Sequence, residues 1–324
     1  MIKIAIDMMG GDNGSAATKE AVRQFLKDYK DVELICVGKK EELSDLEGVT
    51  LIEANDVIKM EAGVMEVLRK KDSSMVKAIR AVDENNCQAV VSCGSTGAFL
   101  SAATLILKKI PGVKRPALCA QFPNIKTGGY VSVLDIGASN ENTPEEIAQF
   151  GYMGTLYCRA ANGVKNPWVG LLSNGSEEGK GSPEGKEAYN LLKEDDRINF
   201  VGNIEGDMVI NSHVDVVVTD GYSGNICMKS TEGAAKGLGA LLKQGFKKNI
   251  FTKIGYLFAK SGIKDLKNKM SSKKVGGAVL LGVNAIAVKA HGNSDDEAFY
   301  HAIALAYRLA KEDICEEMRK GFVE

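Results

Sequence analysis

Five apolar, strand-like runs each end in a glycine-rich polar loop, and this repetition limits the possible folds most strongly. The segments read IAIDMMGGDNG, AVVSCGSTGA, VSVLDIGASNEN, VGLLSNGSEEGKG and DVVVTDGYSGN. Each loop leads into a helix-like stretch. In open α/β sheets, ligands bind beyond the carboxyl ends of the strands, where such loops lie. Glycine lets the backbone approach an anion, and helix N-termini offer it free N–H groups. We therefore expect one polar pocket for phosphate or another oxyanion.

The alternation of strands and helices predicts an α/β fold, with a doubly wound, mostly parallel sheet in a three-layer α/β/α arrangement. The expected strands are 2–7, 33–37, 49–53, 88–92, 117–122, 129–135, 168–172, 198–202 and 214–219. The expected helices are 15–29, 61–70, 73–84, 96–109, 143–161, 184–193, 223–247, 250–260, 277–289 and 294–320. The Thr127-Gly128-Gly129 turn predicts one antiparallel pair. Residues 1–324 are expected to form a single α/β domain.

The composition is that of a globular protein, with 44% apolar and 26% charged residues among 324. The seven cysteines include no C-x-x-C pair. This pattern favours reduced, buried thiols in the cytoplasm over a disulfide framework.

Residues 236–274 form a basic segment in a chain whose net charge is only −1. The segment holds 11 lysines, no arginine and one acidic residue, Asp265. We expect a protruding helical pair that contacts an acidic protein or an anionic membrane surface. The expected contact residues are Lys247, Lys248, Phe251, Lys253, Ile254, Leu257 and Phe258. The alternative is a solvated lysine face over core aromatic residues. Nucleic acid is disfavoured, because the segment has no arginine and no reader motif.

Common catalytic signatures are absent. The first loop lacks the G-x-G-x-x-G pattern because residue 9 is Met, and the GSEEGKGS loop lacks P-loop spacing. The sequence around Ser95 does not match G-x-S-x-G, and the three histidines lack zinc-like spacing. We expect neither a metal nor a cofactor.

Polar residues at the strand ends are the candidates for the pocket. The run Gly94-Ser95-Thr96-Gly97 either binds phosphate or makes a tight turn with a helix cap. Asp7, Asp135 and Asp220 occupy equivalent places, and each either bonds its own turn or points into the pocket.

Two further residues carry alternative interpretations. Lys180, which follows Glu177 in a glycine-rich loop, either stabilises an oxyanion or is a solvated surface lysine. His291 either acts as an acid or anion contact, or makes a structural bond at a helix end.

Together the loops resemble the PlsX family of bacterial phosphate acyltransferases. The matching stretches are IAIDMMGGD, RKKDSSM, SCGSTGAFL, KRPAL, LDIGAS, QFGYMG, SEEGKG, TDGYSGNICMKSTEG, GGAVLLG and HGNSD, which cover nearly the whole chain in the family's order. The family's fold is similar to that of isopropylmalate dehydrogenase and phosphotransacetylase. The sequence departs from the family at Ser95, Ser139 and Ser173, where asparagine is more frequent, and at Ala285, where glycine is.

The resemblance implies transfer of a fatty acyl group from acyl carrier protein to inorganic phosphate in phospholipid synthesis. It implies a metal-free cytoplasmic homodimer, with peripheral contact at the inner face of the membrane in some members. The implied catalytic residues are Lys180 and Asn225, with His291 as a candidate acid. The expected substrate contacts are Asp7, Gly94, Ser95, Thr96, Gly97, Asp135, Ser139, Glu177, Asp220 and Gly224.

Three alternatives stay open at this point. An acyl-CoA or acetyl-CoA phosphotransferase would use the same chemistry, although the basic segment favours an acidic carrier protein. A decarboxylating dehydrogenase would need metal-binding aspartates along one helix, and no such row is present. A non-enzymatic phosphate or acyl sensor would bind substrate without releasing the carrier thiol.

Overall fold

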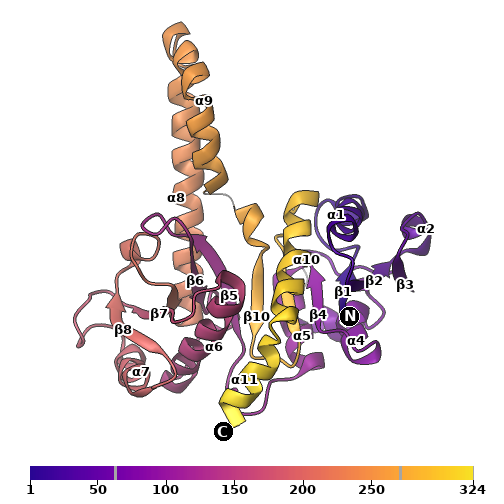
Figure 1. Cartoon of the computed structure of the whole chain (residues 1–324), viewed down its shortest axis with the longest axis horizontal. Coiled ribbons are helices and arrows are strands. Elements are labelled where there is room, and N and C mark those ends of the chain that lie inside the picture. The colour runs from indigo at the N-terminus through magenta and orange to yellow at the C-terminus, as the bar shows by residue number, and fades with distance from the viewer. Residues whose placement is uncertain (62–63, 270–271, 324) are drawn as a thin grey trace.

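The computed structural model describes residues 1–61, 64–269 and 272–323 (Figure 1). The strands are β1 (Ile2–Asp7), β2 (Val32–Gly38), β3 (Val49–Glu53), β4 (Ala89–Ser92), β5 (Ala117–Pro123), β6 (Tyr130–Leu134), β7 (Trp168–Leu172), β8 (Asn199–Ile204), β9 (Val216–Val218), β10 (Ala278–Leu281) and β11 (Ile286–Lys289). The α-helices are α1 (Gly14–Asp28), α2 (Lys40–Leu43), α3 (Val64–Arg69), α4 (Ser74–Glu84), α5 (Thr96–Leu107), α6 (Pro144–Asn162), α7 (Pro183–Glu194), α8 (Gly221–Lys247), α9 (Ile250–Lys269), α10 (Asp296–Lys311) and α11 (Ile314–Val323). Two short 3₁₀ turns are η1 (Gly206–Met208) and η2 (Ser272–Val275). Residues 62–63 of the predicted helix 61–70, and residues 270–271 of the basic segment, lie outside the described residues.

All strands belong to one sheet, in the order β3-β2-β1-β4-β11-β10-β5-β6-β9-β7-β8. Strands β3, β2, β1, β4 and β11 are parallel to one another, and so are β6, β9, β7 and β8. Three antiparallel pairings, β11–β10, β10–β5 and β5–β6, lie between these two sets. The predicted mostly parallel α/β fold is confirmed. The β5–β6 pair is the antiparallel pair that the Thr127-Gly128-Gly129 turn predicted.

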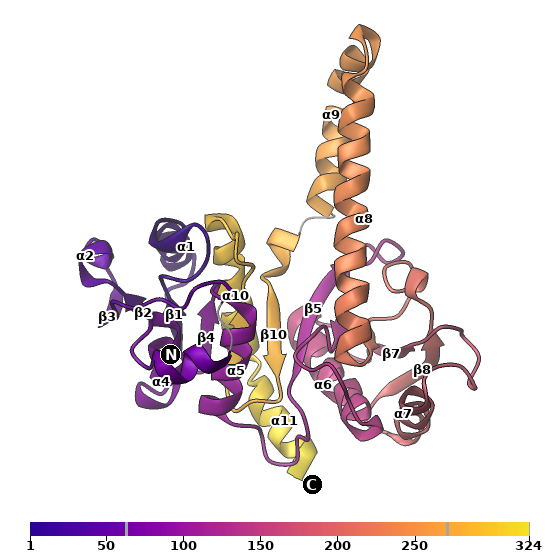
Figure 2. The ribbon, with the colours of Figure 1, turned by 180° about the vertical axis from the view of Figure 1, so that it is seen from behind.

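The core has two layers because side chains alternate between the faces of the sheet. On β1, Ile4 and Ile6 pack on one face, with α1, α6 and α10. Ala5 packs on the other face, with α4 and α5. Figure 2 shows α5 and α8 on this second face, on either side of β10. Five of the seven cysteines are buried and all seven are unpaired, as reduced thiols should be.

The predicted helix 277–289 is wrong, because these residues form β10 and β11. A short buried apolar run cannot be assigned to helix or strand by periodicity alone. Here the run is divided by Gly282, which has φ +88°. A Cβ there would lie 2.9 Å from Val113 Cγ1, so both the backbone and the space favour glycine.

The predicted helix 294–320 is two helices, α10 and α11. The break comes at Asp313, whose φ of +47° is incompatible with a continuous right-handed helix. The α11 helix packs on α6, which belongs to the other half of the sheet.

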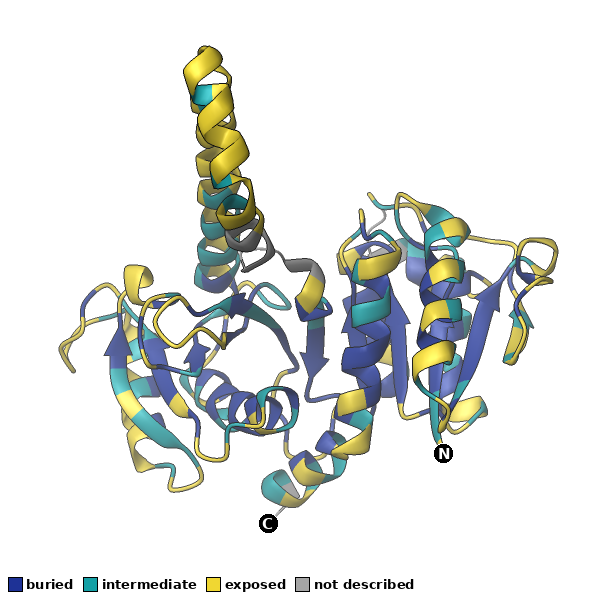
Figure 3. Cartoon of the chain, turned by 45° about the horizontal axis from the view of Figure 1, so that its top comes forward, coloured by how far each residue is buried: buried dark blue, intermediate teal, exposed yellow. Residues whose placement is uncertain are grey.

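Helices α8 and α9 project far beyond the sheet as an antiparallel pair (Figure 1). Most of their described residues are exposed along the projecting part, in contrast to the buried strands (Figure 3). The exposed side chains include apolar ones, with Phe251 80% and Phe258 87% exposed.

Candidate active site

The structure divides the five polar loops into two groups. The loops after β1 and β4 contact each other and the loop after β11. The loops after β6 and β9 contact each other, and together with the loop after β7 they line one cavity. The expectation of one pocket built by all five loops within the chain is therefore wrong. The reason is the strand order, which places the antiparallel strands β10 and β5 between the two sets.

The first group is tightly packed rather than open. The Ser92 hydroxyl donates to Asp7 Oδ2 at 2.7 Å and accepts from the Gly94 amide at 3.1 Å. A Cβ at Gly10 would lie 2.7 Å from the Gly94 nitrogen, so the two loops approach closely. Asp7 and Gly94 thus bond within the loops themselves. The following residues Thr96 and Gly97 are exposed at the start of α5.

Lys289 is a buried charge in this first group that the sequence analysis missed. Its side chain ends beside the loops after β1 and β4, and the residue is only 5% exposed. Burial lowers the pKa of Lys289 to about 8, although attraction from Cys93, Asp7 and Asp12 opposes the shift. In the stretch NAIAVKA, Lys289 looks like an exposed polar residue on a predicted helix. Only the assignment of this stretch to a strand could have indicated that the lysine is buried.

His291 follows β11 and is exposed. Its Nδ1 accepts a hydrogen bond from the Asn293 amide at 3.4 Å. This contact fits the structural alternative at a helix end, and a catalytic role for His291 stays a prediction.

In the second group, Asp135 organises the loop between β6 and α6. Its Oδ1 accepts from the amides of Leu118, Gly137 and Ala138 at 2.9–3.0 Å. Its Oδ2 accepts from the amide and the hydroxyl of Ser139, both at 2.9 Å. Five donors therefore surround a fully buried carboxylate. This geometry makes Asp135 the centre of the turn, and a substrate contact by Asp135 stays a prediction.

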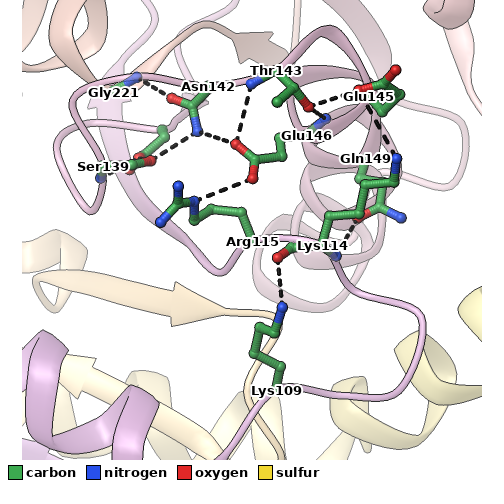
Figure 4. Close-up of polar contacts among 11 residues, drawn as sticks. Lys109, Lys114, Arg115, Ser139, Asn142, Thr143, Glu145, Glu146, Gln149 and Gly221 are labelled. Atoms are coloured by element: carbon green, nitrogen blue, oxygen red, sulfur yellow. Dashed lines mark hydrogen bonds and ion pairs between the residues drawn. The ribbon is translucent and has the colours of Figure 1, made fainter.

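Asn142 joins this loop to the start of α8 (Figure 4). Its Nδ2 donates to Ser139 Oγ at 2.8 Å and to Glu146 Oε2 at 3.1 Å. Its Oδ1 accepts from the Gly221 amide at 3.0 Å. Glu146 Oε1 in turn pairs with Arg115 Nε at 3.3 Å. The sequence analysis missed Asn142, Glu146 and Arg115; the KRPAL stretch was the signal for Arg115.

The N-terminus of α8 fits against the same loop because two of its residues are glycines. Asp220 caps the helix by accepting from the Ser223 amide at 2.8 Å. A Cβ at Gly224 would lie 1.9 Å from the Asp135 carbonyl oxygen, which no side chain could tolerate. This approach places Asn225 beside Gly137, and Asn225 Oδ1 is buried without a hydrogen-bond partner among the described residues.

A cavity of about 1290 Å³ lies between the loops after β6, β7 and β9. Its wall includes Lys180 and Asp220 from the predicted site, together with Arg115 and Glu146. No described residue of the loops after β1 and β4 lines it. The cavity is therefore a polar site in which two cationic side chains, Arg115 and Lys180, lie among the carboxylates of Glu141, Glu146, Glu184 and Asp220. The two cations are the groups in its wall that could contact an anion.

Two further properties concern ligands and membranes. Within the described residues, no group of three or more His, Cys, Asp or Glu side chains is placed to hold a metal ion. None of the helices in the described ranges is long and apolar enough to cross a bilayer.

Solved phosphotransacylases share this fold. The branched-chain phosphotransacylase from Enterococcus faecalis V583 has a TM-score of 0.63 at 14% identity, covering 96% of this chain and 99% of that one. The phosphotransacetylase from Streptococcus pyogenes has a TM-score of 0.60 at 18% identity, covering 96% and 94%. At these identities the likeness establishes the fold.

Comparison of the sequence with known proteins shows the family. The profile described as "Fatty acid synthesis protein" matches residues 2–317. The phosphate acyltransferase of Macrococcus caseolyticus is 39% identical over 322 residues, covering 99% of this chain and 98% of that one. That of Thermosipho melanesiensis is 43% identical over 309 residues, covering 94% and 92%. The chain belongs to this fatty acid synthesis protein family and is an acyltransferase, which confirms the resemblance read from the loops.

Proposed function

We propose that this enzyme transfers a fatty acyl group from acyl carrier protein to inorganic phosphate, giving acyl phosphate. The observation that carries the proposal is a polar cavity lined by Lys180 in a chain that matches phosphate acyltransferases over almost its full length. Phosphate and the thioester carbonyl must meet in one place, and this cavity has the room for both and two cationic side chains in its wall.

The chemistry is a direct displacement. A phosphate oxygen attacks the thioester carbonyl, the carbonyl oxygen gains negative charge, and the carrier thiolate leaves. We assign oxyanion stabilisation to Lys180. Asn225 does not line the cavity, so its catalytic role stays an expectation from the family resemblance. Arg115, held by Glu146, adds a second positive charge to the cavity wall for phosphate. The Gly94–Gly97 run lies outside the cavity, so we place phosphate beside Lys180 instead.

The decisive assay incubates the protein with palmitoyl-ACP and phosphate and measures acyl phosphate and free carrier thiol. We expect both products, and neither when phosphate is omitted. Binding of palmitoyl-ACP without thiol release would instead identify a sensor. Palmitoyl-CoA in place of palmitoyl-ACP tests the alternative carrier, and a clear preference for CoA would refute the assignment to acyl carrier protein.

Lys180→Ala is expected to lower turnover by about 10²–10³-fold, the usual effect of removing one oxyanion donor. Lys186→Ala is the matched control, because Lys186 is exposed on α7 and does not line the cavity. Wild-type turnover in a folded Lys180→Ala protein would exclude Lys180 from the chemistry.

We also propose that the α8–α9 pair receives the acidic carrier protein. Reversing Lys247, Lys248 and Lys253 to Glu should raise KM for acyl-ACP and leave reaction with a small acyl thioester unchanged. The control is the same reversal at three exposed lysines elsewhere, namely Lys27, Lys40 and Lys71. A constant KM across the reversals, and from low to high salt, would exclude docking at this pair.

The exposed residues Phe251, Ile254, Leu257 and Phe258 support a second proposal, peripheral membrane contact. Co-sedimentation with anionic vesicles tests it, and retention in the supernatant would refute it. We further propose a cytoplasmic homodimer. Light scattering behind size-exclusion chromatography measures the mass, and a monomer mass would contradict this.

A further inference from the structure

The loop after β7 contains three glycines that meet different surroundings. Gly181 has φ +110°, so its backbone conformation favours glycine. Gly179 has no atom within 4 Å of where a Cβ would stand. Gly175 is buried and lies outside the left-handed region. A Cβ there would lie 2.8 Å from Lys180 Cγ and 3.2 Å from Lys180 Cδ. Space, rather than backbone freedom, is what requires glycine at residue 175.

The Lys180 side chain therefore runs across the bare α-carbon of Gly175. The contact involves Cγ and Cδ of Lys180 rather than the flexible end of the side chain at Nζ. Moving Nζ alone therefore cannot relieve the overlap with an added methyl group. The same Cβ would lie 3.0 Å from Glu177 Oε2, so Glu177 fills another side of this space.

The backbone around Lys180 is held in place by hydrogen bonds. The Lys180 amide donates to the Glu177 carbonyl oxygen at 3.0 Å, and Asn203 Nδ2 donates to that oxygen at 2.8 Å. The Gly181 amide donates to Asn174 Oδ1 at 3.0 Å. Because these bonds fix the loop on both sides of Lys180, a methyl group at residue 175 displaces the lysine side chain before it displaces the backbone.

We propose that Gly175 is a positioning residue: its missing side chain provides the channel through which Lys180 reaches the cavity. The inference rests on the proposed function of Lys180 as an oxyanion donor. Gly175→Ala should leave the fold intact, because the displaced groups belong to an exposed loop. It should lower turnover by about 10–100-fold, because misplacing a donor by ~1 Å can cost that much.

A double-mutant cycle tests this. Turnover and KM are measured for Gly175→Ala, Lys180→Ala and the double variant, with thermal melts as the check on folding. Gly175→Ala should lower kcat more than it changes KM, and should have almost no further effect in the Lys180→Ala background. The control is Gly179→Ala in the same loop, which should keep wild-type turnover.

Two outcomes would overturn the inference. One is wild-type kcat in Gly175→Ala when Lys180→Ala is impaired. The other is the same loss from Gly175→Ala in both backgrounds, which would mean that the effect does not pass through Lys180. Glu177→Ala is measured alongside; if it reproduces the loss, the effect passes through the carboxylate and the inference fails.

A second readout separates this inference from the proposed function. Competitive amine labelling followed by mass spectrometry measures the reactivity of the Lys180 amine without any turnover. We expect its labelling rate to change in Gly175→Ala and not in Gly179→Ala. An unchanged rate in both variants refutes the positioning role, whichever reaction the enzyme catalyses. A changed rate in an enzyme that makes no acyl phosphate would refute the proposed function alone.

Discussion

Lys289→Met offers a quantitative test of the charge buried between β1, β4 and β11. The wild-type lysine is 5% exposed, and burial lowers its pKa from 10.5 to about 8. Methionine is also unbranched and long, so it fills the same space without the charge. The change also removes the hydrogen bond from Lys289 Nζ to the Ala290 carbonyl oxygen.

The sign of the effect follows from proton binding. Between pH 8 and 10.5 the unfolded chain binds more protons at residue 289 than the folded chain does. The free energy of unfolding of the wild type therefore rises with pH across this window, and the Lys289→Met protein lacks this rise. The full pKa difference corresponds to about 3 kcal/mol, of which about 2 kcal/mol is recovered between roughly pH 7.5 and pH 10.

Urea denaturation followed by circular dichroism at the two pH values measures the difference between variant and wild type. We expect the variant's relative stability to fall by about 2 kcal/mol on going to the higher pH. Lys71→Met, at an exposed lysine, is the matched control. A variant-minus-wild-type difference that stays constant with pH would show that Lys289 is not desolvated as the structure indicates.

Two further predictions concern the helices. Gly224→Ala should destabilise the protein by about 1–3 kcal/mol in thermal or urea melts because its Cβ would overlap the Asp135 carbonyl. Gly233→Ala, in the same helix but facing open space, should instead stabilise it by up to about 1 kcal/mol, and equal effects would refute the packing of α8. Limited trypsin digestion should cut first within residues 236–264. The lysines there are exposed, and the glycines within the two helices make local unfolding easier. Mass spectrometry of the first fragments checks this. First cuts within the sheet would contradict it.

The local pattern of the sequence predicted most of the elements but not their arrangement. Val216, Val217 and Val218 are consecutive apolar residues and form a strand buried on both faces. The run 277–289 has the same character, yet its length suggested a helix. Its pairing partners, β4 and β5, are more than 150 residues away, and no local signal reports them.

The candidate site shows the same division. Lys180 was identified from its loop, because glycine-rich turns at strand ends are a local feature. The separation of Gly94–Gly97 from Lys180 depends on strand order, which only the assembled sheet defines. Glu146 looked like part of an ordinary helix start, and its capping box with Thr143 is indeed present. Its other carboxylate oxygen, Oε1, pairs with Arg115. Arg115 lies just before β5, and no local sequence pattern indicates that it contacts the start of α6.

The place of β10 and β11 in the sheet has a consequence for synthesis of the chain. These strands join the two halves of the sheet, yet they are made after residue 277. Until they leave the ribosome, β4 and β5 each present an unpaired edge, and such edges pair readily with other chains. The segment from β6 to α8 is continuous in sequence and can assemble earlier. A nascent or truncated chain ending before Ala278 should therefore be prone to aggregation, and the last strands act as the closing element of the whole sheet.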